Sequence, residues 1–327
     1  MTGTFNRPTA ADLEIMTKIC PGRTYSGEEI NEDYTHDEMK IYGQYMPDIV
    51  AEVLSADEVS SLLAYCNMRR IAVTPRGAGT GLCGGSVAIY GGLLISLIKM
   101  NHVLDIDRDN MTVTLEPGVL LMDLIEILDK ENLFYPPDPG EKSATIGGNI
   151  MTNAGGMRAV KYGVTRDYVR GITAVLADGS VVDFGGKPAK NSSGLSLKDL
   201  LIGSEGTLAI VTKAVLKVLP KPPATYSGLA PFPSIEAAIA TVPSIISAGL
   251  GPTAVEFMQK EVVGLVKEYL GKTFPDTKAP AYLLISVEAE NDNEAELKMD
   301  RFAELLVKLG AEDVFFADTD ERRESLW

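Results

Sequence analysis

A glycine-rich stretch at residues 75–85, with the sequence PRGAGTGLCGG, is the part of the chain whose residue types point most directly to chemistry. It follows a short apolar run at residues 71–74 and holds five glycines in eleven residues. Because glycine has no Cβ and adopts positive φ, such a turn brings backbone N–H groups close to a ligand. N–H groups that converge in a turn bind anions. We therefore expect this stretch to hold the phosphate or pyrophosphate of a nucleotide cofactor.

The spacing of Gly79, Gly81 and Gly84 matches the G-x-G-x-x-G fingerprint of dinucleotide-binding proteins. That fingerprint requires a helix that opens at the glycines, whereas this chain continues into a second glycine pair and an apolar run at residues 93–97. Asp105 stands near the position of a ribose-binding acid, and we interpret this as a coincidence. A P-loop is excluded, because no glycine is followed by Lys and Ser or Thr in the required frame. A purely structural turn is the alternative that the loop alone leaves open.

Four further runs of small residues lie between apolar segments, at residues 136–140, 145–149, 152–156 and 203–208. Such runs are expected where a long cofactor lies against the backbone. Together with the loop they resemble the FAD-binding domain of the PCMH type in the vanillyl-alcohol-oxidase superfamily. Within that superfamily they are most similar to the branch of glycolate oxidase subunits and D-lactate dehydrogenases. The similarity extends from about residue 47 to about residue 220.

The resemblance implies a set of binding residues for each part of FAD. For the pyrophosphate the set is Pro75, Arg76, Gly77, Ala78, Gly79, Thr80, Gly81, Gly84 and Gly85. For the ribityl and isoalloxazine region it is Pro137, Asp138, Thr145, Gly147, Gly148, Asn149, Thr152, Ala154 and Gly156. For the adenosine end it is Glu205, Gly206, Ile210 and Val211. From the residues alone, Glu205 stays open as a plain surface carboxylate, and Ile210 and Val211 stay open as strand core.

The resemblance also bears on how the flavin is held. Relatives that link FAD covalently place a histidine in the phosphate loop, in an Arg-x-Gly-Gly-His arrangement, and this chain has Thr80 at that position. Cys83 lies nearby, and we interpret it as a small apolar filler, the usual role of a cysteine in a tight loop. We therefore expect FAD to be bound noncovalently.

Composition excludes several other classes of protein. The chain of 327 residues has 30 Lys and Arg against 45 Asp and Glu, and the net charge of -15 argues against nucleic acid and anionic membrane surfaces as partners. The two histidines, His36 and His102, are not in a metal-ligand spacing, so no metal site is expected among these residues. The three cysteines form no zinc or redox pair, which suits a reducing compartment. Without a signal peptide or an apolar run of membrane-spanning length, the expected location is the cytoplasm.

The elements that must position the loop are readable from periodicity. After a helix at residues 10–16 and a polar loop at 28–38, we expect a strand at 49–53, an amphipathic helix at 56–70 and a strand at 71–74. A second lobe follows, with a strand at 112–116, a helix at 120–131, a hairpin over 172–184 and a strand at 210–219. The prolines at 220, 222 and 223 mark the clearest domain boundary.

Beyond that boundary the chain alternates between helix and strand. We expect helices at 234–248, 261–270 and 293–309, and strands at 253–258, 282–288 and 313–317. The predicted domains are an N-terminal helical extension at 1–46, an FAD-binding domain at 47–220 with lobes at about 47–105 and 106–220, and a third unit at 221–327. The fold class is α+β, and the resemblance identifies the third unit as the first part of an α/β, ferredoxin-like cap domain.

The resemblance places the catalytic groups outside the residues given. Relatives carry, beyond the equivalent of Trp327, an arginine for the substrate carboxylate and a pair of histidines with a glutamate that hold a divalent metal. We therefore expect an incomplete cap, with no catalytic residue assigned in this chain and a metal only if a C-terminal remainder exists.

The activity implied by the resemblance is that of an FAD-dependent dehydrogenase for a small D-2-hydroxy acid, D-lactate first and glycolate second. Electrons would pass to a separate acceptor, for which an electron-transferring flavoprotein is one candidate. Two alternatives stay open: a non-catalytic FAD subunit for electron transfer, and a UDP-sugar reductase with the same FAD fold.

Overall fold

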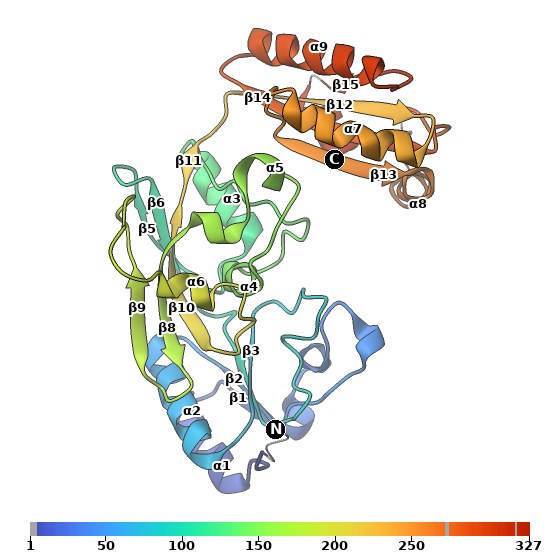
Figure 1. Cartoon of the computed structure of the whole chain (residues 1–327). Coiled ribbons are helices and arrows are strands. Elements are labelled where there is room, and N and C mark those ends of the chain that lie inside the picture. Colours follow the sequence, from blue (N-terminus) through green and yellow to red (C-terminus); the bar gives the residue numbers. More distant parts are fainter. Residues whose placement is uncertain (1–4, 272–274, 318) are drawn as a thin grey trace. The chain divides into compact units, whose positions relative to one another are not determined.

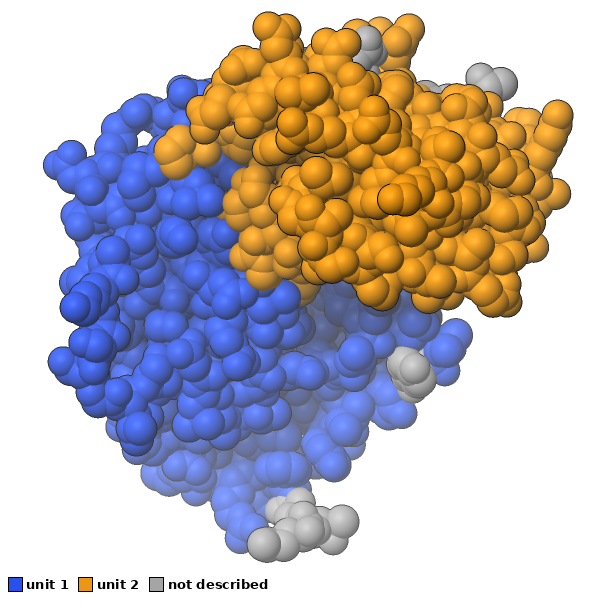
Figure 2. All heavy atoms as spheres, turned by 45° about the horizontal axis from the view of Figure 1, so that its top comes forward, with its two compact units in different colours: residues 1–135, 139–154, 164–219 blue, residues 136–138, 155–163, 220–327 orange. Residues whose placement is uncertain are grey.

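The computed structural model describes residues 5–271, 275–317 and 319–327, so residues 1–4 of the predicted N-terminal extension lie outside it. The chain forms two compact units (Figures 1 and 2). Unit 1 contains residues 1–135, 139–154 and 164–219, and unit 2 contains residues 136–138, 155–163 and 220–327. The domain limits expected from the sequence stay a prediction.

The first lobe of unit 1 is built on a four-stranded sheet in the order β1-β2-β4-β3. Its elements are α1 (Ala10–Ile19), β1 (Thr24–Ser26), β2 (Ile49–Glu52), α2 (Ala56–Arg69), β3 (Val73–Arg76) and β4 (Leu93–Ser96). Strands β2 and β3 each pair with β4 in parallel, and β1 pairs with β2 antiparallel. Strand β3 corresponds to the strand expected at 71–74, but it begins two residues later, at Val73. Strand β3 leads directly into the glycine-rich loop.

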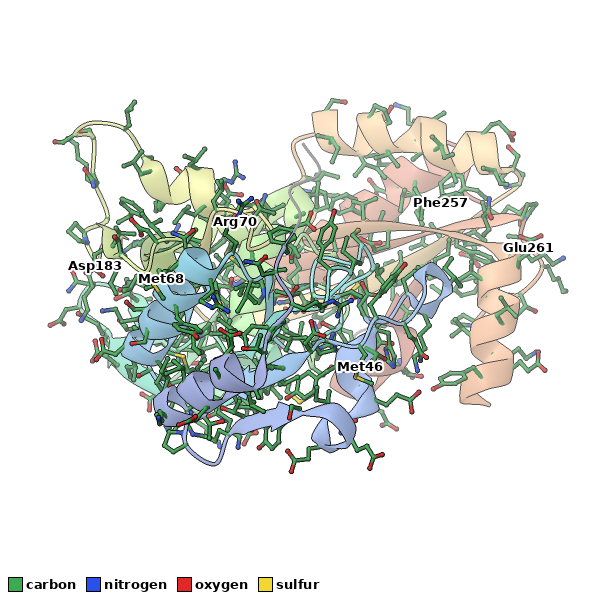
Figure 3. The ribbon with its side chains drawn as sticks, turned by 90° about the horizontal axis from the view of Figure 1, so that it is seen from below. Met46, Met68, Arg70, Asp183, Phe257 and Glu261 are labelled. Carbon is green, nitrogen blue, oxygen red and sulfur yellow. The ribbon has the colours of Figure 1, made fainter. Side chains whose placement is uncertain are left out.

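Helix α2 has an N-cap and the apolar face that its sequence predicts. Ser55 caps its first turn, and Val59, Leu62 and Cys66 lie on the buried face at helical spacing. Met68 lies off that face and is 71% exposed (Figure 3). Three short 3-10 helices lie between β1 and β2: η1 (Gly27–Glu29), η2 (Glu32–Thr35) and η3 (Lys40–Tyr42). The loop predicted at 28–38 contains η2 and most of η1, and η3 follows it.

The second lobe of unit 1 is an antiparallel sheet in the order β5-β6-β10-β8-β9. Its elements are β5 (Val103–Asp107), β6 (Thr112–Leu115), α3 (Leu121–Lys130), α4 (Ile146–Thr152), η4 (Thr165–Tyr168), β8 (Val169–Leu176), β9 (Val181–Gly185), α6 (Leu197–Leu201) and β10 (Ala209–Lys217). The predicted hairpin is confirmed, because β8 and β9 pair across the turn that contains Gly179. A two-stranded sheet joins β7 (Leu133–Phe134) and β11 (Leu219–Pro220).

Unit 2 contains an antiparallel sheet in the order β13-β14-β12-β15. Its elements are α5 (Ala159–Tyr162), β12 (Ala224–Phe232), α7 (Ile235–Ser247), β13 (Ala254–Gln259), α8 (Lys260–Leu270), β14 (Ala281–Ala289), α9 (Asp292–Lys308), β15 (Phe315–Ala317) and α10 (Asp320–Leu326). This order is that of a ferredoxin-like β-α-β-β-α-β unit in which α8, begun near Glu261, is inserted between β13 and β14 (Figure 3). Helices α7 and α9 bury one sheet face, with Phe232 and Phe302 fully enclosed.

Among the described residues, no helix combines the length and the apolar character that a membrane crossing requires. The same residues contain no group of three or more His, Cys, Asp or Glu side chains arranged to hold a metal ion.

Candidate cofactor site

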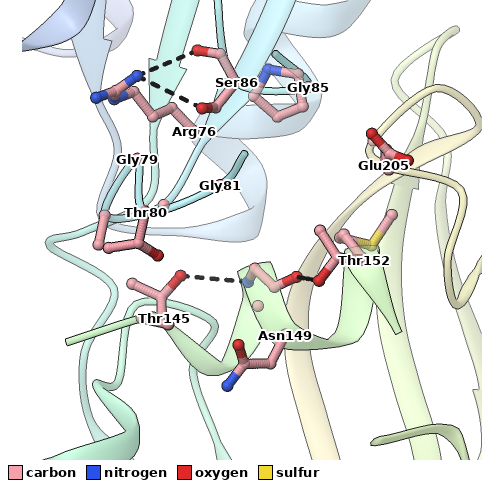
Figure 4. Close-up of a pocket in the computed structure, with 18 of the residues that line it drawn as sticks. Arg76, Gly79, Thr80, Gly81, Gly85, Ser86, Thr145, Asn149, Thr152 and Glu205 are labelled. Atoms are coloured by element: carbon pink, nitrogen blue, oxygen red, sulfur yellow. Dashed lines mark hydrogen bonds between the residues drawn. The ribbon is translucent and has the colours of Figure 1, made fainter. Parts of the chain in front are cut away.

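A cavity of about 400 Å³ lies within unit 1, a volume in the range of small-molecule and cofactor sites. Most of the site residues expected from the sequence line it (Figure 4). They are Pro75, Arg76, Gly77, Ala78, Gly79, Thr80, Gly81, Gly85, Thr145, Gly147, Gly148, Asn149, Thr152, Ala154, Glu205, Gly206, Ile210 and Val211. Segments far apart in the sequence therefore meet around one hollow, which argues against a purely structural role for the glycine loop.

The loop owes its path to glycines that cannot be replaced without a clash. Gly79 has φ of +80°, and a Cβ there would overlap the guanidinium of Arg76. At Gly77 a Cβ would overlap the Thr145 hydroxyl. Gly206 belongs to a separate turn at residues 203–208. A Cβ there would approach the Pro75 ring to 2.4 Å, so that turn packs directly against the end of β3. The glycines thus allow the walls of the cavity to approach one another closely.

Arg76 is 6% exposed, and its guanidinium is held by protein carbonyls. Nη1 donates to His36 O at 2.7 Å and to Ser86 O at 3.3 Å, and Nη2 donates to Asp33 O at 2.7 Å (Figure 4 shows the Ser86 contacts). Burial lowers the pKa of Arg76 from its ordinary value, although an arginine stays charged at neutral pH. Arg76 therefore brings a positive charge to the cavity wall while it ties the loop to neighbouring segments.

Helix α4 forms another wall, where the sequence suggested only runs of small residues. Thr145 caps it by accepting a hydrogen bond from Gly148 N at 3.2 Å, and the Thr152 hydroxyl donates to Gly148 O at 2.9 Å (Figure 4). Gly147 lies against Pro117, which a Cβ would approach to 2.6 Å. Glycine lowers helix propensity, so this helix depends on its cap and its close packing and was not expected from the sequence.

Asn149 on α4 is the polar side chain that best fits a bound cofactor. It is 5% exposed and lines the cavity, and its Nδ2 has no hydrogen-bond partner among the described residues. Since a buried amide donor without a partner is costly, this N–H suits an acceptor atom of a ligand. Glu205 also lines the cavity, with φ of +53°, and its N–H donates to Met151 O at 2.8 Å.

Four expected site residues are not in the wall of this cavity. The N–H of Gly84 donates to the Asp37 carboxylate at 2.7 Å, so it is used within the protein. Pro137, Asp138 and Gly156 belong to unit 2. There, Asp138 is 6% exposed and forms an ion pair with Arg158 at 3.3 Å.

Several wall residues were not expected as ligands. They are Leu82, Cys83, Ser86, Leu97, Pro117, Pro139, Glu141, Ala144, Met151 and Ala209. The interpretation of Cys83 as an apolar filler is wrong, because its side chain is exposed and lines the cavity. Ile210 and Val211 are both strand core and cavity wall, with 4% and 1% exposure.

Glycine turns, a capped glycine-containing helix and an unpartnered buried donor surround one cavity, as in a protein that binds a nucleotide cofactor. Residues 47–185 match the family of the FAD binding domain, and residues 221–327 match the C-terminal domain of FAD linked oxidases. The chain belongs to the family of FAD-linked oxidoreductases that contains D-lactate dehydrogenases and glycolate oxidase subunits. FAD is the cofactor of this family.

Two similar proteins illustrate the relationship. The chain is 47% identical to a D-lactate dehydrogenase from Anaerostipes hadrus, over 99% of this chain and 69% of that protein. It is 42% identical to glycolate oxidase subunit GlcD from Bacillus subtilis, over 90% of this chain and 62% of the relative. The chain therefore spans 62% to 69% of the length of these two proteins. In fold it is similar to alkyldihydroxyacetonephosphate synthase, with a TM-score of 0.80 and 23% identity over 98% of this chain and 67% of that structure.

Proposed function

We propose that the protein is an FAD-dependent dehydrogenase that oxidises a small D-2-hydroxy acid to the 2-oxo acid, with D-lactate the first candidate and glycolate the second. The observation that carries this proposal is the 47% identity to a D-lactate dehydrogenase over 99% of the chain. The cavity supports it, because its wall is made of the segments that the resemblance assigns to FAD. When bound, FAD would supply the two-electron acceptor for the oxidation of the substrate alcohol.

In this proposal the residues of unit 1 bind and orient the cofactor. The pyrophosphate would be held by backbone N–H groups of residues 77–81, which line the cavity, and the charge of Arg76 would compensate part of its negative charge. The Nδ2 group of Asn149 would donate a hydrogen bond to the cofactor, which would satisfy a donor that has no partner among the described residues. Leu97, Ile210 and Val211 supply an apolar wall that excludes water from one side.

Two further properties are the protein that accepts the electrons and the cellular compartment. We propose a separate redox protein as the electron acceptor, for which an electron-transferring flavoprotein is one candidate implied by the family resemblance. We propose the cytoplasm as the compartment, since Cys20, Cys66 and Cys83 are free thiols, as a reducing environment maintains them.

Anaerobic addition of D-lactate to the purified flavoprotein tests the activity. The expected result is loss of the oxidised flavin absorbance with D-lactate and not with L-lactate, and the same titration with glycolate ranks the two substrates. A protein that holds FAD and is reduced by none of these acids would contradict the dehydrogenase proposal and favour a subunit for electron transfer.

A further inference from the structure

Asp37 lies behind the glycine-rich loop and uses both carboxylate oxygens to hold backbone N–H groups. It is 3% exposed and does not line the cavity. Oδ2 accepts a hydrogen bond from Gly84 N at 2.7 Å, and Oδ1 accepts one from Met39 N at 2.9 Å. A carboxylate that is buried in this way is costly unless N–H groups satisfy it, so its position is tightly specified.

The chain around Asp37 contacts the same loop at further points. The N–H of Glu38 donates to Gly81 O at 3.1 Å. The carbonyls of Asp33 and His36 each accept a hydrogen bond of 2.7 Å from the Arg76 guanidinium. Arg76 also supplies a positive charge close to this acidic segment. Residues 33–38, which we call the brace, therefore hold the loop at its start, middle and end.

The Asp37 contact fixes the direction of one peptide in the loop. Gly84 has φ of +77°, and its N–H is directed to the carboxylate, which is not part of the cavity wall. The next residue, Gly85, lies in the cavity wall, as do residues 75–83. Because the peptide that joins Cys83 to Gly84 is planar, the orientation of the Gly84 N–H also fixes the Cys83 carbonyl, at the end of the wall segment that precedes it. Without Asp37 this N–H would lose its partner, and the loop would relax toward another arrangement.

We propose that Asp37 is a positioning residue for the cofactor: by holding Gly84 it keeps the glycine-rich loop in the shape that presents N–H groups to the FAD phosphates. The inference rests on the proposed FAD site. It assigns to an acidic residue a favourable part in binding an anionic group, because the carboxylate acts through the loop and not on the phosphate.

The test compares the affinities of deflavinated protein variants for FAD and for riboflavin, which carries no phosphate. Flavin fluorescence measures both dissociation constants. For Asp37→Ala we expect FAD binding weakened by about tenfold to a hundredfold, the effect of losing a hydrogen bond to a charged group, while riboflavin binding stays close to that of the wild type. Asp37→Asn keeps one acceptor oxygen for Gly84 N but turns its NH2 group toward Met39 N, so it should restore only part of the FAD affinity.

Asp57→Asn is the matched control, because it makes the same substitution at an exposed residue of α2 that lies outside the brace and outside the cavity wall. It should bind FAD like the wild type. If Asp37→Ala does not fold, Asp37→Glu keeps the charge but displaces the carboxylate, and it should lower the FAD affinity selectively. An unchanged FAD affinity in these variants, or an equal loss for FAD and riboflavin, would overturn the inference, as would Asp37→Asn binding as weakly as Asp37→Ala. Failure of the wild-type protein to bind FAD would contradict the proposed function, a result distinct from any of these.

Discussion

Gly79 is the residue on which the loop conformation depends most. Its φ of +80° lies in the region that residues with side chains rarely adopt, and the space beside it is filled by the Arg76 guanidinium. A side chain at this position would strain the backbone and displace Arg76 from the carbonyls that hold it. A substitution of Gly79 therefore loses stability in two ways, through backbone strain and through the displacement of Arg76.

We predict that Gly79→Val abolishes FAD binding and leaves the rest of the fold largely intact. The ratio of flavin to protein absorbance after purification measures the loss. Gly140→Val is the control, since Gly140 follows the wall residue Pro139 in the sequence, but a Cβ added there would meet no atom within 4 Å. Stoichiometric FAD in Gly79→Val would show that this loop does not bind the pyrophosphate.

At the level of single residues, the sequence predicted wall positions well where small residues cluster. Gly77, Thr145 and Asn149 follow from such clusters, because only short side chains allow a close approach of the backbone. The role of Asp37 could not be predicted in this way, since its partner Gly84 is 47 residues further along the chain. Contacts between distant segments leave no local pattern.

At the level of elements, periodic apolar patterns predicted α2 and α9 to within one or two residues. They failed for β12, the strand that pairs with both β14 and β15 in unit 2. This strand contains Gly228 and Pro231, which are unfavourable in strands, and tertiary pairing overrides that preference.

The contact between α1 and α2 gives a prediction that depends on pH. Asp12 on α1 is 1% exposed and accepts hydrogen bonds from Arg69 Nε at 2.8 Å and from the Tyr65 hydroxyl at 2.7 Å. The hydrogen bond from Arg69 holds the pKa of Asp12 well below its ordinary value. A carboxyl with a lowered pKa in the folded state stabilises the fold above its unfolded pKa, and this stabilisation is lost as the pH falls.

We expect Asp12→Asn to lower the free energy of unfolding at pH 7 by about 1 to 3 kcal/mol, since it removes charged hydrogen bonds from a buried site. The difference from the wild type should shrink as the pH falls below about 4. Urea unfolding at several pH values measures it. Asp57→Asn, in the first turn of α2, should cost less than about 1 kcal/mol. A difference that grows at low pH would contradict the prediction.

Helix α5 is attached to β14 by a buried carboxylate within unit 2. Glu288 on β14 accepts hydrogen bonds from Lys161 Nζ at 2.6 Å and from the Tyr162 hydroxyl at 2.5 Å. Its side chain is 6% exposed, so a lost counter-charge is not replaced freely by water.

We predict that Lys161→Met destabilises the protein by about 1 to 3 kcal/mol, and that Lys161→Met with Glu288→Gln costs less than the sum of the single changes. Thermal unfolding of the wild type, the two single variants and the double variant gives the coupling energy of the double-mutant cycle. Lys298→Met is the control, because Lys298 donates to the backbone carbonyl of Glu288 and not to its carboxylate. Additive effects of the two changes would show that the pair is not coupled.

For the molecule as a whole, we predict that FAD leaves the polypeptide unmodified on acid precipitation. Thr80 lines the cavity at the position where relatives with covalent FAD have a histidine. Cys83 also lines the cavity, so Cys83→Ser should release the same amount of FAD as the wild type. Absorbance of the supernatant and the intact mass of the polypeptide measure the outcome, and flavin retained in the pellet would contradict it.

The discontinuous make-up of unit 2 limits how the protein can be divided or recombined. Residues 136–138 and 155–163 precede most of this unit in the sequence, yet they supply Asp138, Arg158 and the partners of Glu288. A fragment cut at Pro220 would carry Glu288 without Lys161 and Tyr162. Exchange of residues 220–327 between relatives is therefore not the transfer of a complete unit: a chimera also needs the donor's two short segments at 136–138 and 155–163.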